Sequence, residues 1–166
     1  TGKIPYPPPL VLGHEAAGVV IEVGEGVTEF KEGDHVVSSF ISMCGKCRQC
    51  VRGRPVLCEN ARKAMFTLPD GTVRTKDANG EPLNVFGACG VMAEYATMHV
   101  DNCVKVDKSV PMQNAALVGC AVMTGVGAVF NTAQLEPGSR AAVFGIGGVG
   151  LNAIQGCATA GAEMIV

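Results

Sequence analysis

Four cysteines in the segment 44–58 limit most strongly what this chain can fold into. Their spacing is C-x2-C-x2-C-x7-C, and the thiols belong to Cys44, Cys47, Cys50 and Cys58. Two residues between thiols allow a tight turn to direct both sulfurs at one point, and the seven-residue return brings in a fourth. This pattern predicts a closed, tetrahedral zinc site of the structural kind. Four unrelated thiols, or two disulfides in a secreted chain, are the alternatives, and the specific spacing without other signs of secretion favours zinc.

Composition and charge restrict the remaining possibilities. The chain has 166 residues, enough for one domain or a little more, and 48% of them are hydrophobic, enough for a sizeable core. A net charge of −2 argues against a nucleic-acid partner, because phosphate binding requires a basic face. The basic residues among the thiols are interpreted as solvated surface that partly offsets thiolate charge; they are Lys46, Arg48, Arg52 and Arg54. No uninterrupted apolar run reaches the 18 residues of a membrane span and no signal peptide is recognisable, so we predict a cytoplasmic protein without a membrane partner.

The first part of the sequence predicts short strands separated by glycine turns. Residues 11–24 run from a loop of small residues into a β-branched strand, and residues 31–37 form a turn that leads into another. Residues 59–86 are polar, with turn signals at Asp70-Gly71 and Asn79-Gly80, and predict a surface loop that bears a hairpin. A further strand is expected over 93–100. We therefore predict a compact β unit from which the cysteine lobe (residues 44–58) projects.

The last part of the sequence predicts a nucleotide-binding unit. Helix is expected from residue 112 onward, a buried strand over 140–144, a second helix over 151–160 and a second strand over 163–166. Gly145, Gly147 and Gly150 lie between the first strand and the following helix, where they allow a tight turn, approach of a pyrophosphate and helix packing. The acidic residue that selects between NAD and NADP is expected about 20 residues further on, beyond Val166.

Four motifs in one order resemble the zinc-dependent alcohol dehydrogenases of the medium-chain dehydrogenase/reductase superfamily. They are Gly13-His14-Glu15-x-x-Gly18, the four-cysteine lobe, Gly119-Cys120 with Thr124-Gly125, and the glycine loop. The resemblance implies an α/β plus β fold. A GroES-like, β-rich catalytic domain would occupy residues 1–123, with the structural-zinc lobe at 44–58. A linker helix and the start of an NAD(P)-binding Rossmann domain would occupy residues 124–166.

The resemblance also implies the site residues. Taken alone, His14 and Cys120 are more often structural than metal ligands; by resemblance they hold a catalytic zinc, with Glu15 beside it. The expected NAD-binding residues are Thr124, Gly145, Gly147, Gly148, Val149 and Gly150. The family's third catalytic-zinc ligand, a cysteine, falls before Thr1, and the chain ends inside a predicted strand. We therefore expect a piece of a longer protein that has little dehydrogenase turnover by itself, which an assay of this polypeptide tests.

The implied function is oxidation of a primary alcohol, aryl or thiol-adduct, to an aldehyde by hydride transfer to NAD, with NADP not excluded. Two zinc ions per intact subunit and a homodimer or homotetramer are expected. The alternative is a non-catalytic zinc-binding module, and zinc-free quinone reductase relatives are disfavoured because they lack the four-cysteine lobe. Packing or surface roles are predicted for the remaining histidines and cysteines, His35, His99, Cys89, Cys103 and Cys157.

Overall fold

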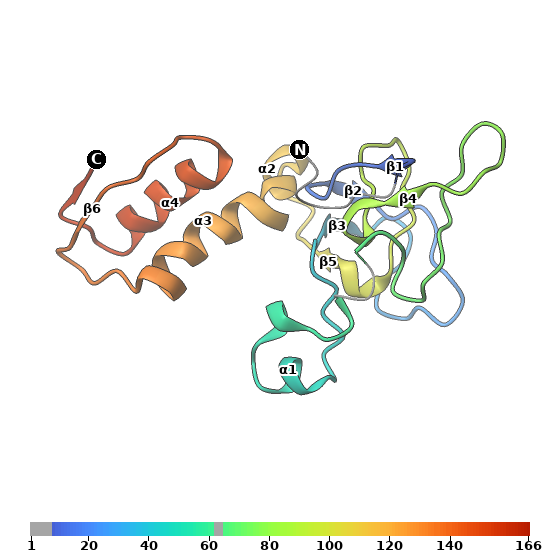
Figure 1. Cartoon of the computed structure of the whole chain (residues 1–166), viewed down its shortest axis with the longest axis horizontal. Coiled ribbons are helices and arrows are strands. Elements are labelled where there is room, and N and C mark those ends of the chain that lie inside the picture. Colours follow the sequence, from blue (N-terminus) through green and yellow to red (C-terminus); the bar gives the residue numbers. More distant parts are fainter. Residues whose placement is uncertain (1–7, 62–64) are drawn as a thin grey trace. The chain divides into compact units, whose positions relative to one another are not determined.

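The computed structural model describes residues 8–61 and 65–166. The chain forms two units, Thr1–Ala116 and Leu117–Val166, and each is described here by itself. Figure 1 shows strands β1 to β5 and the cysteine lobe in the first unit, and α3, α4 and β6 in the second.

Two small sheets form the β part of the first unit. An antiparallel sheet has the order β2 (Ala17–Val19), β3 (His35–Ser38), β5 (Cys103–Lys105), and β1 (Leu10–Val11) pairs in parallel with β4 (Asn84–Val85). The strand β3 is central and carries three buried residues in succession, which suits β-branched side chains between two covering layers. The predicted β unit is thus confirmed.

Short helical turns connect these strands. They are α1 (Arg48–Val51), η1 (Pro55–Leu57), η3 (Phe86–Ala88) and η4 (Val100–Asn102). The strand predicted over 93–100 is wrong: residues 91–99 are irregular, with Tyr95 72% exposed. The chain instead enters η4, whose first turn is capped by His99 Nδ1 accepting a hydrogen bond from the backbone N–H of Asp101 at 3.2 Å. A local side-chain cap of this kind competes with strand pairing.

The polar loop forms the predicted turns. The Gly71 N–H donates to the Leu68 carbonyl at 2.8 Å, and the Gly80 N–H donates to the Asp77 carbonyl at 3.0 Å. An isolated antiparallel bridge between Lys76 and Pro82 closes the second turn.

A continuous helical stretch, Met112–Ala133, leads into the second unit. It consists of α2 (Met112–Leu117), a π turn η5 (Val118–Val122), α3 (Met123–Gly127) and a second π turn η6 (Ala128–Ala133). Its 22 residues are long and apolar enough to span a bilayer, although no uninterrupted apolar run reaches that length. The core helix of a soluble protein meets the same criteria, and the α3 part of this stretch packs against α4.

The predicted strand–helix–strand unit is confirmed. The strand β6 (Arg140–Ala141) pairs in parallel with β7 (Met164–Ile165), and α4 (Gly148–Thr159) connects them. The buried strand expected over 140–144 is shorter than predicted: β6 covers only Arg140–Ala141, although the Val143 N–H still donates to the Val166 carbonyl at 2.7 Å. Phe144 is 98% exposed rather than buried.

Small residues allow the two helices of the second unit to approach closely. A β-carbon added at Gly125 of α3 would overlap the Val149 carbonyl and lie 2.7 Å from the Ala153 nitrogen. One added at Gly156 of α4 would lie 3.2 Å from Val129, which is buried in the core of this unit. The helices therefore pack almost backbone to backbone at these points.

A buried carboxylate stabilises the sheet of the first unit, and Asp34→Asn is expected to expose its pH dependence. Asp34 is 6% exposed, and its Oδ2 accepts from Lys105 Nζ at 2.8 Å and from the Lys31 N–H at 3.0 Å. The hydrogen bond from Lys105, followed by that from Lys31, lowers the pKa of Asp34 below 3.8. A lowered pKa stabilises the fold above the unfolded-state value, and this contribution is lost as the pH falls through the folded-state value.

We therefore expect Asp34→Asn to lower the urea midpoint at pH 7, and the difference from the wild type to narrow below pH 3.8. The control is Asp70→Asn, whose exposed pair with Arg74 lies on the surface hairpin and contributes little. Equal urea midpoints of unfolding for Asp34→Asn and the wild type at pH 7 would show that the Asp34 carboxylate does not stabilise the sheet.

Candidate metal centre and nucleotide loop

The fold gathers the four cysteines of the lobe around one point. Their four sulfur atoms all lie within 4.8 Å of one another, with Cys58 Sγ at 3.7 Å from Cys44 Sγ and 3.9 Å from Cys47 Sγ. Tetrahedral zinc with Zn–S bonds of about 2.3 Å requires sulfurs about 3.8 Å apart. All four are free thiols, so the disulfide alternative does not describe this lobe. The arrangement fits a single tetrahedral metal ion.

Turns within the lobe place these thiols. Gly45 and Gly53 adopt positive φ angles of 69° and 72°, which favour glycine. Cys47 is the N-cap of α1, and η1 brings the chain back, so that the Cys58 N–H donates to the Pro55 carbonyl at 2.9 Å. Cys58 is only 1% exposed and is the most buried of the four ligands.

Backbone hydrogen bonds lower the pKa of two of these thiols, which favours their deprotonation. The N–H groups of Cys50 and Glu59 lower the pKa of Cys47 to about 6. Burial raises the pKa of Cys58, but hydrogen bonds from the N–H groups of Cys44 and Ala61 outweigh it and the net shift is downward. Burial, and then the neighbouring Cys47, raise the pKa of Cys50 to about 12. A metal ion binding here must displace the Cys50 proton, so metal affinity rises with pH.

The loop that carries His14 is fixed by a glycine and a buried serine. Gly13 has φ +93°, and a β-carbon there would lie 2.8 Å from Met92 Cγ and 2.9 Å from the Met92 nitrogen. Ser38 Oγ donates to the His14 carbonyl at 2.7 Å and accepts from the Ala16 N–H at 2.9 Å. The backbone is therefore held on both sides of Glu15, which is exposed, whereas His14 is half-buried.

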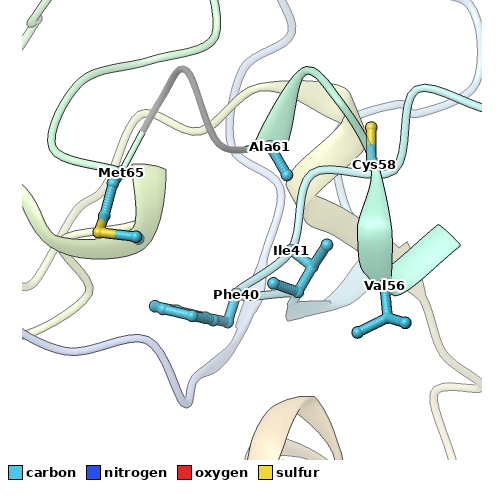
Figure 2. Close-up of a pocket in the computed structure, with 7 residues that line it drawn as sticks. Phe40, Ile41, Val56, Cys58, Ala61 and Met65 are labelled. Carbon is cyan, nitrogen blue, oxygen red and sulfur yellow. The ribbon is translucent and has the colours of Figure 1, made fainter. Parts of the chain in front are cut away.

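Two aromatic rings flank the His14 imidazole. The ring centroids of Phe40 and Phe86 lie 5.0 and 5.4 Å from it, both in edge-on orientation. Phe40 also lines a hollow of about 200 Å³ between the end of β3 and the cysteine lobe. Figure 2 shows the residues that line it, which are Phe40, Ile41, Val56, Cys58, Ala61, Met65 and Gly87. Apart from the Cys58 thiol, which belongs to the four-cysteine cluster, the lining is apolar, so the hollow suits an apolar ligand.

The sequence did not point to Phe40, Ile41 or Val56 as residues that line a hollow. Phe40 and Ile41 follow β3, whereas Val56 lies in η1 of the cysteine lobe, so two separate segments meet at the hollow. The lining of the hollow is therefore a product of tertiary packing.

The predicted residues of the second unit lie on two neighbouring elements. Cys120 Sγ is 3.8 Å from Thr124 Oγ1, one helical turn further on. Gly145 has φ +98°, and a β-carbon at Gly150 would overlap the Gly145 carbonyl. Gly147 is the N-cap of α4, and exposed Val149 lies in its first turn. A β-carbon at Gly148 would lie 3.4 Å from Ala121 Cβ, so the helix that bears Cys120 approaches the glycine loop.

His14 lies in the first unit and Cys120 in the second. Their predicted convergence on a catalytic zinc stays a prediction, as do the roles of Glu15 and Thr124. The proposed boundary between domains at 123/124 likewise stays a prediction. His35, His99 and the cysteines outside the lobe do not belong to the four-cysteine cluster.

Comparisons with known proteins identify a family and relatives that this chain resembles. The family model of the alcohol dehydrogenase GroES-like domain matches residues 1–108. An S-(hydroxymethyl)glutathione dehydrogenase of Paracoccus denitrificans is 42% identical over 160 residues, which cover 95% of this chain and 43% of the relative. A protein of the same name from Escherichia coli O1:K1 / APEC is 43% identical with the same coverage.

Solved structures agree with these relatives. An alcohol dehydrogenase zinc-binding domain protein from Burkholderia ambifaria has a TM-score of 0.87 at 40% identity, covering 97% of this chain and 44% of that one. The benzyl alcohol dehydrogenase of Acinetobacter calcoaceticus has a TM-score of 0.81 at 38% identity, covering 99% and 44%. The chain thus spans less than half the length of the relatives it matches.

Proposed function

The chain belongs to the alcohol dehydrogenase GroES-like domain family, and on this premise we propose that it forms part of a zinc- and NAD-dependent dehydrogenase. The reaction proposed is oxidation of a primary alcohol to its aldehyde, with hydride transfer to the nicotinamide. The observation that carries the proposal is the four-thiol cluster in a domain of this family. NADP is an open alternative, because the residue expected to select the coenzyme is not in the chain.

Two groups of residues would hold zinc. The four cysteines of the lobe would hold a structural ion. His14 and Cys120, with Glu15 nearby, would contribute to a catalytic one. Zinc bound there supplies Lewis acidity toward an alcohol oxygen. The donor set of one histidine and cysteine thiolate suits zinc, which takes nitrogen and sulfur ligands.

The residues of the chain would perform the remaining tasks. Phe40 and Phe86 would restrain the His14 ring by edge-on contact. The glycine loop and the N-terminus of α4 would bind the coenzyme pyrophosphate through backbone N–H groups. In this proposal Thr124 and Val149 face the nicotinamide.

The proposed substrate class rests on the hollow that Phe40 lines. Apart from the Cys58 thiol its lining is apolar, and it includes an aromatic ring, which favours an aryl alcohol. The relative named for benzyl alcohol supports this choice, and the two relatives named for S-(hydroxymethyl)glutathione support a thiol-adduct alcohol as the second candidate. For the whole protein we propose a cytoplasmic homodimer or homotetramer, as the family resemblance implies.

A chimera tests the proposed function. This chain replaces the aligned segment of the Paracoccus denitrificans enzyme, and NADH formation is measured with benzyl alcohol and with S-(hydroxymethyl)glutathione. We expect NAD-dependent turnover, and we expect His14→Ala to lower kcat/KM about a thousandfold, because Lewis-acid stabilisation contributes several kcal/mol.

His99→Ala is the matched control, since His99 is exposed and caps only a short turn. It should leave kcat/KM unchanged. A folded, zinc-loaded chimera without NADH formation would contradict the proposal and favour the non-catalytic zinc-binding module.

A further inference from the structure

We propose that Asn102 is a positioning residue that holds both the aromatic wall beside His14 and the entry to the cysteine lobe. Its catalytic meaning rests on the proposed function, while its structural effect is independent of any metal or turnover. No motif in the sequence singles out Asn102, which lies at the end of η4.

Asn102 is completely buried and makes polar contacts with both ends of one segment. Its Nδ2 donates to the Ser39 carbonyl at 2.8 Å, and its Oδ1 accepts from Ser42 Oγ at 2.6 Å. Its backbone carbonyl also accepts from the Ser39 N–H at 2.7 Å. A buried amide is costly unless it is paired, and here both of its polar atoms are paired within the protein.

The segment between these contacts carries the wall of the hollow. Phe40 and Ile41 lie between Ser39 and Ser42 and both line the hollow. Phe40 also packs edge-on against the His14 ring, at 5.0 Å between centroids. The amide of Asn102 therefore fixes both ends of the stretch that supports His14.

The same segment leads directly into the metal lobe. Cys44 follows Ser42 by two residues, and the Met43 N–H donates to the Asp101 carbonyl at 3.3 Å, next to Asn102. Asn102 thus helps to fix the position at which the chain enters the lobe, just before the first thiol of the cluster. An apolar side chain could fill the same space, but it could not bridge a carbonyl and a hydroxyl.

Loss of the amide should move the segment rather than only weaken the fold. In Asn102→Ala, the buried Ser42 hydroxyl loses its acceptor, and the Ser39 carbonyl keeps only the weak Cys89 Sγ donor at 3.5 Å. We expect the segment to relax, Phe40 to leave its contact with His14, and zinc affinity of the four-cysteine site to fall about tenfold, as for outer-shell partners of metal ligands.

NMR of the chain distinguishes positioning from general stability. In the wild type we expect a nuclear Overhauser effect between the His14 ring protons and the Phe40 ring, and ring-current shifts of the His14 signals. Both should be lost in Asn102→Ala under conditions where the chain stays folded. Ser42→Ala removes one of the two hydrogen bonds of the Asn102 side chain and should weaken the same NMR signals. It is the test variant if Asn102→Ala does not fold.

The control is Leu68→Ala, which creates a cavity at a buried residue at the base of the surface hairpin. It should lower stability without changing the His14 signals. The proposal is overturned if Asn102→Ala and Ser42→Ala both fold and leave the His14–Phe40 contact as in the wild type. Failure of the proposed function is seen separately, as a folded, zinc-loaded chimera that forms no NADH.

Discussion

Cys58→Ser is expected to reduce zinc affinity of the lobe about a hundredfold. Structural zinc sites contribute about 10–16 kcal/mol of binding free energy, or about 3 kcal/mol for each of four ligands. Cys58 is also the least exposed of the four, so the substitution removes the sulfur around which the last part of the lobe packs. Competition with a chromogenic zinc chelator measures the change.

Trypsin gives a second readout of the same variant. Lys46, Arg48 and Arg52 are exposed cleavage sites within the lobe. Zinc should protect them in the wild type, and this protection should disappear in Cys58→Ser. Cys103→Ser is the control, because Cys103 lies in β5 of the same unit but outside the cluster. Wild-type zinc affinity in Cys58→Ser would refute the assignment of this thiol as a ligand.

Gly125→Ala is expected to destabilise the second unit by about 2 kcal/mol, the range seen when a close-packed interior is overfilled. The new methyl group would overlap the Val149 carbonyl, and the atoms it meets include backbone, which cannot rotate away. The helices α3 and α4 would have to separate. Hydrogen exchange of the α4 amides measures the change, and it reports the second unit alone.

The control for this change lies on the same helix. A β-carbon at Gly127 would meet only Asn131 Nδ2 at 3.6 Å, an ordinary contact. Gly127→Ala should therefore stabilise the unit by up to about 1 kcal/mol through helix propensity. If the two variants change the hydrogen-exchange rates of the α4 amides in the same direction, close packing of α3 on α4 does not explain the need for glycine at position 125.

Local spacing made parts of this fold predictable. The four thiols lie close in sequence, so their turns alone bring them together, and the strand–glycine loop–helix order of the second unit also depends on neighbouring residues. His14 and Cys120 became candidates only by family resemblance, because a single histidine or cysteine carries no local signal of metal binding.

The errors arose where tertiary partners decide the structure. Residues 93–100 have the composition of a strand, but the His99 cap draws the chain into η4 and no strand pairs with them in the described structure. The residues expected as a buried strand form β6 only over Arg140–Ala141, and Phe144 is exposed, because burial depends on the elements that cover a strand. Asn102 was missed for a related reason, since its partners lie 60 and 63 residues away.

The direct measurement of the central claim is zinc X-ray absorption on the chain, combined with a count of zinc per molecule. A structural four-thiolate site predicts a tightly retained zinc ion with four sulfur neighbours at about 2.3 Å. A chain that retains no zinc and carries these cysteines as disulfides, or a zinc ion surrounded mainly by oxygen and nitrogen, would contradict the account.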